Sequence, residues 1–163
     1  MNENIKDIVI RPAVNADLPR LAEFLQFLVN AERPFDPTLK EGEIFYYSIQ
    51  ELILDNKTEV LVIECKGQLV GCGYAQIREA KPYQKHELFG YLGFMYVDPE
   101  FRGKGLNGLL INELNKWVLS QGISEVRLDV YYDNEAAVNA YKKAGFKAIL
   151  TTMRCDISET DNE

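Results

Sequence analysis

The sequence predicts an α/β domain of the α+β type, with a mixed, mostly antiparallel central sheet and helices on both faces. Two observations predict this class. First, residues 59–65, 68–78 and 87–97 are apolar, β-branched segments joined by short polar loops, which is typical of consecutive antiparallel strands. Second, the pattern after residue 98 changes to helix, strand, helix, and a crossover helix joins strands that run in parallel.

The N-terminal third predicts one strand and two helices. Residues 8–11 form a short apolar strand, and Asn15 can cap a helix whose apolar residues recur at three- and four-residue spacing. That helix is expected to end near Arg33, because a residue that precedes a proline, here Pro34, is disfavoured in a helix. A second helix is expected over residues 39–54.

The middle of the chain predicts a hairpin and a longer strand. Lys66 and Gly67 join the first two apolar segments in a tight turn, where the glycine can take a positive φ. The segment 87–97 contains Gly90 and Gly93, and glycine inside a strand marks a bulge or the close approach of another backbone.

The C-terminal third predicts a helix that starts at Leu106 and is closed by Gly122. A strand at 125–130, a helix at 134–144 and a last strand at 146–156 follow. We therefore expect residues 1–157 to form a single domain, with residues 158–163 as an acidic tail.

Composition excludes several classes of protein. The net charge of −7 and a pI near 4.9 argue against nucleic acid or a membrane as a partner, because both need a basic face. The N-terminus lacks the pattern of a signal peptide, and no apolar run approaches the length of a membrane span. The three cysteines have no CxxC spacing, so we expect reduced thiols in a cytoplasmic protein and no metal.

The most informative stretch is the loop at residues 98–108, between a predicted strand and a predicted helix. Its glycines Gly103, Gly105 and Gly108 allow tight turns and let a ligand approach the backbone. The start of a helix offers unpaired N–H groups, and Arg102 and Lys104 add two positive charges. The pattern indicates a site for a pyrophosphate, and the alternative is a glycine-rich loop that binds nothing.

The same three glycines also match the dinucleotide fingerprint GxGxxG, with Asp129 at about the distance expected for a ribose-binding acid. The context of the match is wrong. A polar bend separates the strand from the first glycine, and Asp129 is predicted to lie within a strand rather than at its end. Too few residues follow to complete a doubly wound sheet, so we reject a nicotinamide-dinucleotide enzyme.

The loop resembles the acyl-CoA site of the GNAT superfamily of N-acetyltransferases, whose signature is Arg/Gln-x-x-Gly-x-Gly/Ala after a strand that ends in Val-x-Pro. Here the sequence reads Val97-Asp98-Pro99 and then Arg102-Gly103-Lys104-Gly105-Leu106-Asn107. Asn107 stands where the family has Gly or Ala, and Gly108 follows it. A second motif resembles the C-terminal motif of the family: Asn134-x-x-Ala137-x-x-x-Tyr141-x-x-x-Gly145-Phe146. The order of elements also agrees over nearly the whole chain.

This resemblance implies a fold, a reaction and a cosubstrate. The parallel strands on either side of the crossover helix would splay apart. The protein would transfer the acetyl group of acetyl-CoA to a primary amine, by direct attack in a ternary complex. Met95, Tyr96 and Val97 would line the pantetheine arm, although Met95 and Val97 can equally serve core packing. The pyrophosphate would be held by Arg102, Gly103, Lys104, Gly105, Leu106, Asn107 and Gly108.

Two residues of the second motif carry implied roles. Tyr141 would donate a proton to the CoA thiolate, and its alternative is a core aromatic at helical spacing with Ala137 and Ala144. Asn134 would contact the CoA arm, and it is also a good helix N-cap.

The general base remains open. Many relatives carry a glutamate three or four residues before the valine of Val-x-Pro, and those positions here are Phe94 and Gly93. Glu87 lies earlier on the same predicted strand and is the carboxylate that we predict to act in catalysis. The alternatives are Glu32, Asp36, Tyr96 or ordered water.

The acceptor pocket is expected between the loop at 32–37, the second helix and the loop at 80–86. This half of the chain is rich in aromatic residues: Phe35, Phe45, Tyr46, Tyr47, Tyr83, Phe89 and Tyr91. Aromatic residues beside carboxylates favour a small cationic amine with an apolar body over a protein N-terminus. The runner-up function is a non-catalytic acyl-CoA-binding or sensing domain. A homodimer is common among such relatives.

Overall fold

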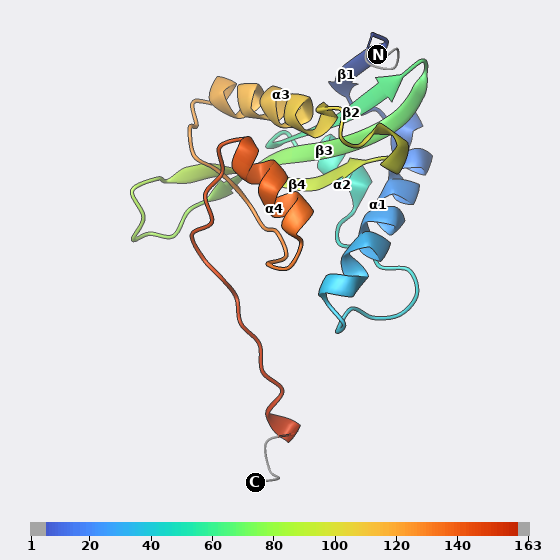
Figure 1. Cartoon of the computed structure of the whole chain (residues 1–163). Helices are drawn as coiled ribbons and strands as arrows, with labels where there is room; N and C mark the ends of the chain where they lie inside the picture. The colour runs from blue at the N-terminus through green and yellow to red at the C-terminus, as the bar shows by residue number, and fades with distance from the viewer. Residues whose placement is uncertain (1–5, 160–163) are drawn as a thin grey trace. The chain divides into compact units, whose positions relative to one another are not determined.

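The computed structural model describes residues 6–159 (Figure 1). The chain divides after Asp129 into two compact units. The first unit holds the sheet and the helices that cover it, and the second holds one helix and the segment that follows it. The expectation of one domain over 1–157 stays a prediction. Within residues 6–159, the structure contains no helix with the length and hydropathy that crossing a membrane requires.

The sheet has five strands in the order of the sequence: β1 (Ile8–Pro12), β2 (Thr58–Cys65), β3 (Gln68–Glu79), β4 (Leu88–Val97) and β5 (Val126–Leu128). The first four pair antiparallel, and β4 pairs with β5 in parallel. Lys66 and Gly67 both have positive φ in the turn between β2 and β3, as the hairpin prediction requires. The predicted mixed, mostly antiparallel sheet is confirmed.

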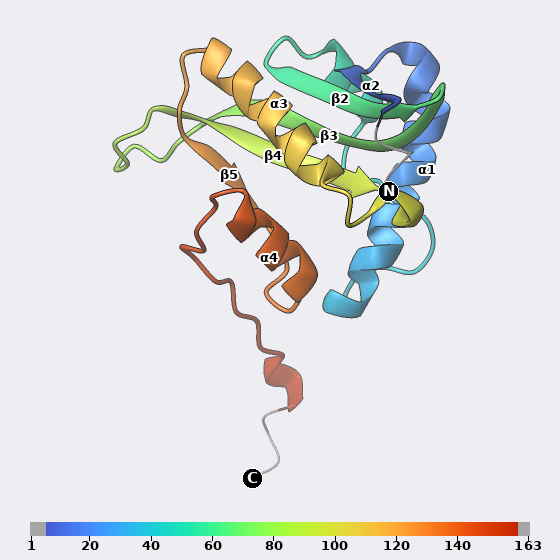
Figure 2. The ribbon, with the colours of Figure 1, turned by 45° about the horizontal axis from the view of Figure 1, so that its top comes forward.

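Helices cover both faces of this sheet (Figures 1 and 2). In the first unit, α1 (Leu18–Glu32) and α2 (Ile49–Leu54) lie on one face and α3 (Leu106–Ser120) lies on the other. The second unit contains α4 (Glu135–Lys143). Short 3-10 turns occupy Asn15–Asp17, Arg33–Phe35, Pro99–Phe101 and Ile157–Glu159.

The first helix begins later than predicted: Asn15 was expected to cap it, but α1 begins at Leu18. A 3-10 turn at Asn15–Asp17 precedes α1, and Asp17 accepts a hydrogen bond from the Val14 N–H at 2.8 Å. Arg11 holds the same carboxylate at 2.8 and 2.9 Å. The carboxylate of Asp17 therefore links the end of β1 to the start of the helix.

The predicted helix over residues 39–54 is wrong in its first part, since α2 covers only Ile49–Leu54. Gly42 has φ +81°, which an α-helix does not accept. The side chain of Gln26 bonds the N–H and the carbonyl of Ile44, and so holds the loop against α1. The helix starts only where Ser48 caps it, by accepting from the Glu51 N–H at 3.3 Å.

The predicted last strand is also wrong. Residues 146–156 form no strand in the part of the chain that the structure describes. β-propensity depends on a neighbouring strand, and β-branched residues alone do not supply one. For the same reason β5 is shorter than the predicted 125–130, because pairing with β4 covers only three residues.

Two glycines allow α3 to pack closely on its face of the sheet. A Cβ atom at Gly90 would lie 2.6 Å from Cγ2 of Val118, and one at Gly73 would lie 3.1 Å from Leu110. Such distances leave no room for a methyl group. The prediction that Gly90 marks the close approach of another backbone is corrected, because its close neighbour is the side chain of Val118 on α3.

Candidate active site

β4 carries a bulge in its second half. Cys72 pairs with Tyr96 and Tyr74 pairs with Gly93, so β4 has one residue more than β3 between these two pairs. Phe94 lies in the bulge with φ +53°, a conformation that is strained for a bulky residue. The bulge predicted near Gly93 is therefore confirmed, but the residue with a positive φ is Phe94.

Buried contacts hold this strained residue. The Phe94 side chain is only 3% exposed, and its ring centroid lies 5.5 Å from that of Tyr47. The thiol of Cys72 donates to the Phe94 carbonyl at 3.5 Å. Burial raises the pKa of the Cys72 thiol, so the thiol remains a protonated donor.

The parallel pair of strands separates directly before the bulge. Pairing of β4 with β5 starts at Gly90 and ends where Leu92 meets Leu128, although β4 continues to Val97. Within the described residues, Gly93 to Val97 therefore have no β5 partner. Such an edge exposes N–H and C=O groups that an extended chain of amides can bond. The three residues predicted to line a pantetheine arm, Met95, Tyr96 and Val97, lie on this edge.

The glycine-rich loop follows at the end of β4. Gly103 and Gly105 have φ +73° and +81°, so both glycines serve the turn itself. Among residues 6–159, the amide N–H groups from Gly103 to Gly108 donate to no protein acceptor. Helix α3 then begins at Leu106, whose side chain is buried in the core. The result is a helix start with its donors available to an anion.

Two cations flank these donors. Arg102 Nε donates to the Val97 carbonyl at 2.8 Å, which leaves its terminal nitrogens without a bond to any described residue. Lys104 Nζ lies 5.2 Å from the ring centroid of Phe101. Unpaired amides beside a guanidinium and an ammonium fit a pyrophosphate group.

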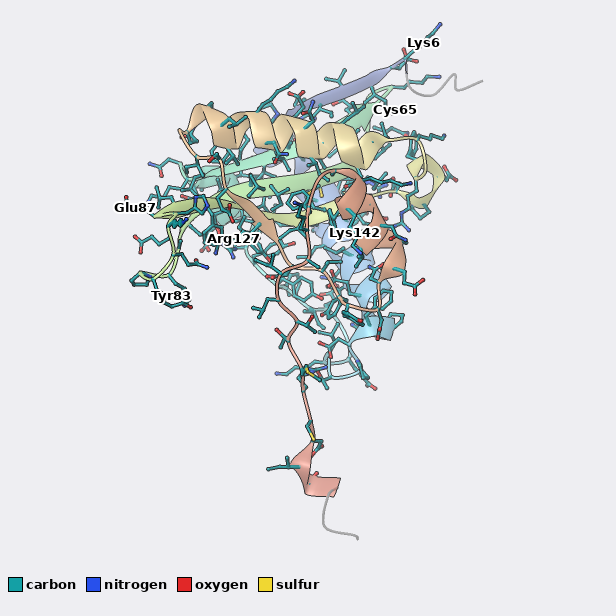
Figure 3. The ribbon with its side chains drawn as sticks, turned by 60° about the vertical axis from the view of Figure 1, so that its left-hand side comes forward. Lys6, Cys65, Tyr83, Glu87, Arg127 and Lys142 are labelled. Carbon is teal, nitrogen blue, oxygen red and sulfur yellow. The ribbon has the colours of Figure 1, made fainter. Side chains whose placement is uncertain are left out.

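Three of the base candidates are disfavoured by their surroundings. Burial and the neighbouring Asp98 raise the pKa of Tyr96 to about 12, so its phenol stays protonated at neutral pH. Asp36 accepts from the N–H and the hydroxyl of Thr38, and so is engaged in its own turn. Glu87 is exposed and lies just before β4 (Figure 3). About 20 Å of extended strand separates it from Phe94.

Glu32 lies in an aromatic cluster that reaches the bulge. Tyr46 donates to its carboxylate at 2.7 Å, and burial raises the pKa of Glu32. The Tyr46 ring lies 6.2 Å from the Tyr47 ring, which in turn contacts Phe94. The hydroxyl of Tyr47 is buried and has no partner among residues 6–159.

The other predicted acceptor residues are only partly brought together. Tyr83 is at the tip of the loop between β3 and β4 and is 83% exposed (Figure 3), and Phe45 is 67% exposed. Phe89 lies beneath the guanidinium of Arg127 at 4.2 Å. A surface hollow of about 540 Å³ is lined by residues that were not predicted: Gln26, Asn30, Arg33, Glu41, Gly42 and Glu43.

A carboxylate that the sequence analysis set aside also lies at the site. β5 ends at Leu128, so Asp129 follows the carboxyl end of the strand and is not within it. The Tyr91 hydroxyl donates to Asp129 Oδ2 at 2.9 Å. The sequence did contain a signal for Asp129, which is its position near the carboxyl end of a predicted parallel strand. Ligands bind at the carboxyl ends of such strands.

The two residues of the C-terminal motif lie in the second unit. Asn134 caps α4 by accepting from the Ala137 N–H at 3.2 Å, which confirms the predicted N-cap. The ring of Tyr141 packs edge-on against Phe146 at 6.0 Å. Their contacts with CoA stay predictions. Among the residues described, no group of three or more His, Cys, Asp or Glu side chains could hold a metal ion.

The open parallel pair and the glycine-rich helix start agree with the splayed strands and the CoA loop that the GNAT resemblance implies. The chain belongs to the acetyltransferase (GNAT) family, whose model matches residues 24–146.

Individual proteins agree with this assignment. The chain is 29% identical over 150 residues to an uncharacterized N-acetyltransferase of Methanocaldococcus jannaschii, a match that covers 88% of this chain and 62% of that protein. It spans less than two thirds of the length of the curated relatives it matches.

Two solved structures share the fold. A mutant of the BH1408 protein from Bacillus halodurans has a TM-score of 0.83 at 19% identity, with 91% of this chain and 99% of that chain covered. A predicted acetyltransferase with acetyl-CoA from Clostridium acetobutylicum has a TM-score of 0.70 at 18% identity, with 95% and 99% covered.

Proposed function

We propose that the protein transfers the acetyl group of acetyl-CoA to a primary amine, by direct attack of the amine in a ternary complex. The observation that carries the proposal is the Phe94 bulge at the point where β4 and β5 separate, followed by a helix start with unpaired amides. The neighbour from Clostridium acetobutylicum, a predicted acetyltransferase whose structure is with acetyl-CoA, supports the same ligand class.

The cosubstrate is held along β4 and the loop. The N–H groups of residues 103–108 bind the pyrophosphate together with Arg102 and Lys104. The pantetheine amides bond the open edge at Met95, Tyr96 and Val97. This arrangement brings the thioester to the bulge, where the N–H of Met95 or Tyr96 can donate to its carbonyl oxygen. A donor at that position stabilises the negative charge that develops during attack.

The reaction exchanges one bond for another. The amine lone pair forms a bond to the acetyl carbon, and the C–S bond breaks with its electron pair on sulfur. Tyr141 supplies the proton that the thiolate needs, in the role that the C-terminal motif implies.

The acceptor is a small cationic or apolar-bodied amine. Tyr46, Tyr47 and Phe94 offer aromatic surface beside the bulge, and Glu32 adds a negative charge at its rim. Aromatic faces and a carboxylate together attract an organic ammonium ion.

The test is turnover with a panel of primary amines: phenethylamine, tryptamine, 1,4-diaminobutane and a short peptide with a free N-terminus. Mass spectrometry detects the acetylated product directly, so the cysteine thiols of the protein do not interfere with the assay. We expect at least one small amine to be acetylated in preference to the peptide. Acetylation of the peptide alone would contradict the small-amine assignment.

A non-catalytic acyl-CoA-binding domain is the second candidate. It is favoured by one observation, which is that Phe94 and Gly93 occupy the positions where relatives carry a catalytic glutamate. Binding of acetyl-CoA without turnover of any amine would favour this second function.

A further inference from the structure

We propose that Asp129, held by Tyr91, is the carboxylate that receives the ammonium group of the acceptor and takes its proton. The inference rests on the proposed function and assigns a residue to the base that the missing β4 glutamate leaves open. It also names the ligand of this carboxylate, which is a primary ammonium ion on a small organic body.

The position of the pair comes from the strand register. Leu92 and Leu128 form the last pair of the parallel ladder. Tyr91 immediately precedes Leu92 on β4, and Asp129 immediately follows Leu128. The hydrogen bond between them, at 2.9 Å, therefore lies at the fork where the two strands separate. The open edge of β4, with the bulge at Phe94, begins one residue further on.

Tyr91 is built to hold the carboxylate. Its hydroxyl donates to Oδ2, so Oδ1 remains available to a ligand. Burial, and then the neighbouring Asp129, raise the pKa of Tyr91, and the phenol stays a protonated donor at neutral pH. Tyr74 and Arg78 of β3 are the other titratable or charged groups that act on this hydroxyl. The Arg78 guanidinium lies over the Tyr91 ring at 3.7 Å and fixes its plane.

The charge of Asp129 is not neutralised by the protein. Among residues 6–159, no lysine, arginine or histidine nitrogen lies within ion-pair distance of its carboxylate. The guanidinium of Arg78 stacks on the ring of Tyr91 and that of Arg127 pairs with Glu125 at 3.3 Å, so neither pairs with Asp129. Asp129 is also exposed, so a cation can reach it from solvent. An unpaired carboxylate in this position favours an ammonium ligand.

The proton balance of the step is complete. The acceptor arrives as R–NH3⁺ and gives one proton to the Asp129 carboxylate, which frees the lone pair on nitrogen. That lone pair forms the C–N bond, and the C–S bond breaks with its electrons on sulfur. The second proton leaves nitrogen and ends on sulfur, and Asp129 returns its proton to water. The sum is an N-acetylated amine, a free thiol and one released proton.

The test compares Asp129→Asn with the wild type over the amine panel and over pH. Asparagine keeps an oxygen for the Tyr91 hydroxyl and removes the charge. We expect kcat/KM to fall by about 100-fold or more, with the affinity for acetyl-CoA unchanged. The rate of the variant should keep rising with pH up to the pKa of the amine itself. The wild-type rate should instead level off at a lower pH. Asp7→Asn is the matched control, since Asp7 is exposed just before the first strand and pairs only loosely with Lys66, at 3.8 Å.

A second measurement keeps the inference open to contradiction if Asp129→Asn fails to fold. Asp129→Ala should be inactive, and added formate should restore part of its activity by supplying the missing carboxylate. An active wild type with an unchanged rate and pH profile in Asp129→Asn would overturn the inference and leave the proposed function intact. Loss of acetyl-CoA binding in Asp129→Asn would also overturn the inference, because it would indicate that Asp129 has a structural role. A wild type that acetylates no amine of the panel would overturn both.

Discussion

Arg102 Nε donates to the carbonyl of Val97 at 2.8 Å, and this bond ties the glycine-rich loop to the end of the bulged strand. The bond orients the guanidinium without using its terminal nitrogens. The residue that precedes the loop thereby helps to fix the cation that the loop presents. The bond therefore connects the anion site at the start of α3 to the end of β4.

Substitution of that arginine should weaken acetyl-CoA binding. In Arg102→Ala the loss of a charge-assisted bond to phosphate should raise Kd by about 10- to 100-fold, which isothermal titration calorimetry can measure. Lys116→Ala is a suitable control, because Lys116 is exposed on α3 and pairs with Glu113. An unchanged Kd in Arg102→Ala would discredit the proposed pyrophosphate site.

The two glycines at the start of α3 should respond in opposite directions to alanine. Gly105 has φ +81°, so Gly105→Ala introduces strain of about 1 kcal/mol and should lower Tm by about 2–4 °C. Gly108 lies within the helix with open space around it, and Gly108→Ala should raise Tm slightly. Thermal unfolding followed by circular dichroism measures both. Equal shifts in the two variants would contradict the role assigned to the positive φ.

The close packing of α3 on the sheet makes a further prediction. Gly90→Ala should destabilise the protein by about 1–3 kcal/mol, because its methyl group collides with Val118. Adding Val118→Ala should recover about 1 kcal/mol relative to the sum of the two single effects, in a double-mutant cycle by urea unfolding. Strict additivity would show that the glycine is not required for this contact.

Tyr141 is expected to act on the leaving thiolate. Tyr141→Phe should slow turnover while the affinity for acetyl-CoA stays nearly unchanged, since the ring and its contact with Phe146 remain. Steady-state kinetics and calorimetry on the same preparation separate the two effects. Turnover equal to that of the wild type would remove Tyr141 from the mechanism.

Acid should weaken the join between β1 and α1. The hydrogen bonds from Arg11 lower the pKa of Asp17, so ionised Asp17 stabilises the folded state above the usual aspartate pKa of about 3.9. This contribution is lost as the pH falls through the lowered pKa of the folded state. Asp17→Asn should therefore cost about 1–2 kcal/mol of unfolding free energy at pH 7, and this cost should shrink as the pH falls through the lowered pKa. A pH-independent cost would contradict the assignment.

The sequence predicted the sheet well because alternation and turn residues are local signals. The segments at 59–65 and 68–78 became β2 and β3 with changes of one residue at an end, and the turn at Lys66 and Gly67 formed as expected. The glycine loop was equally local, since its turns depend on residues within the loop. Each of these features needs only neighbours along the chain.

The errors arose where distant parts of the chain decide the structure. The loop before α2 is held by Gln26, which lies 18 residues away from Ile44. The end of β5 depends on where β4 stops offering a partner, so Asp129 was wrongly placed inside a strand. The pairs Tyr46–Glu32 and Tyr91–Asp129 join residues on different elements. No short-range pattern indicates such contacts.

The central claim is most directly tested by titrating the purified protein with acetyl-CoA in a calorimeter, with NADH as the control ligand. We predict saturable binding of acetyl-CoA and no binding of NADH. Absence of acetyl-CoA binding, or binding of NADH in its place, would contradict the assignment of the β4 bulge and the glycine-rich loop to an acetyl-CoA site.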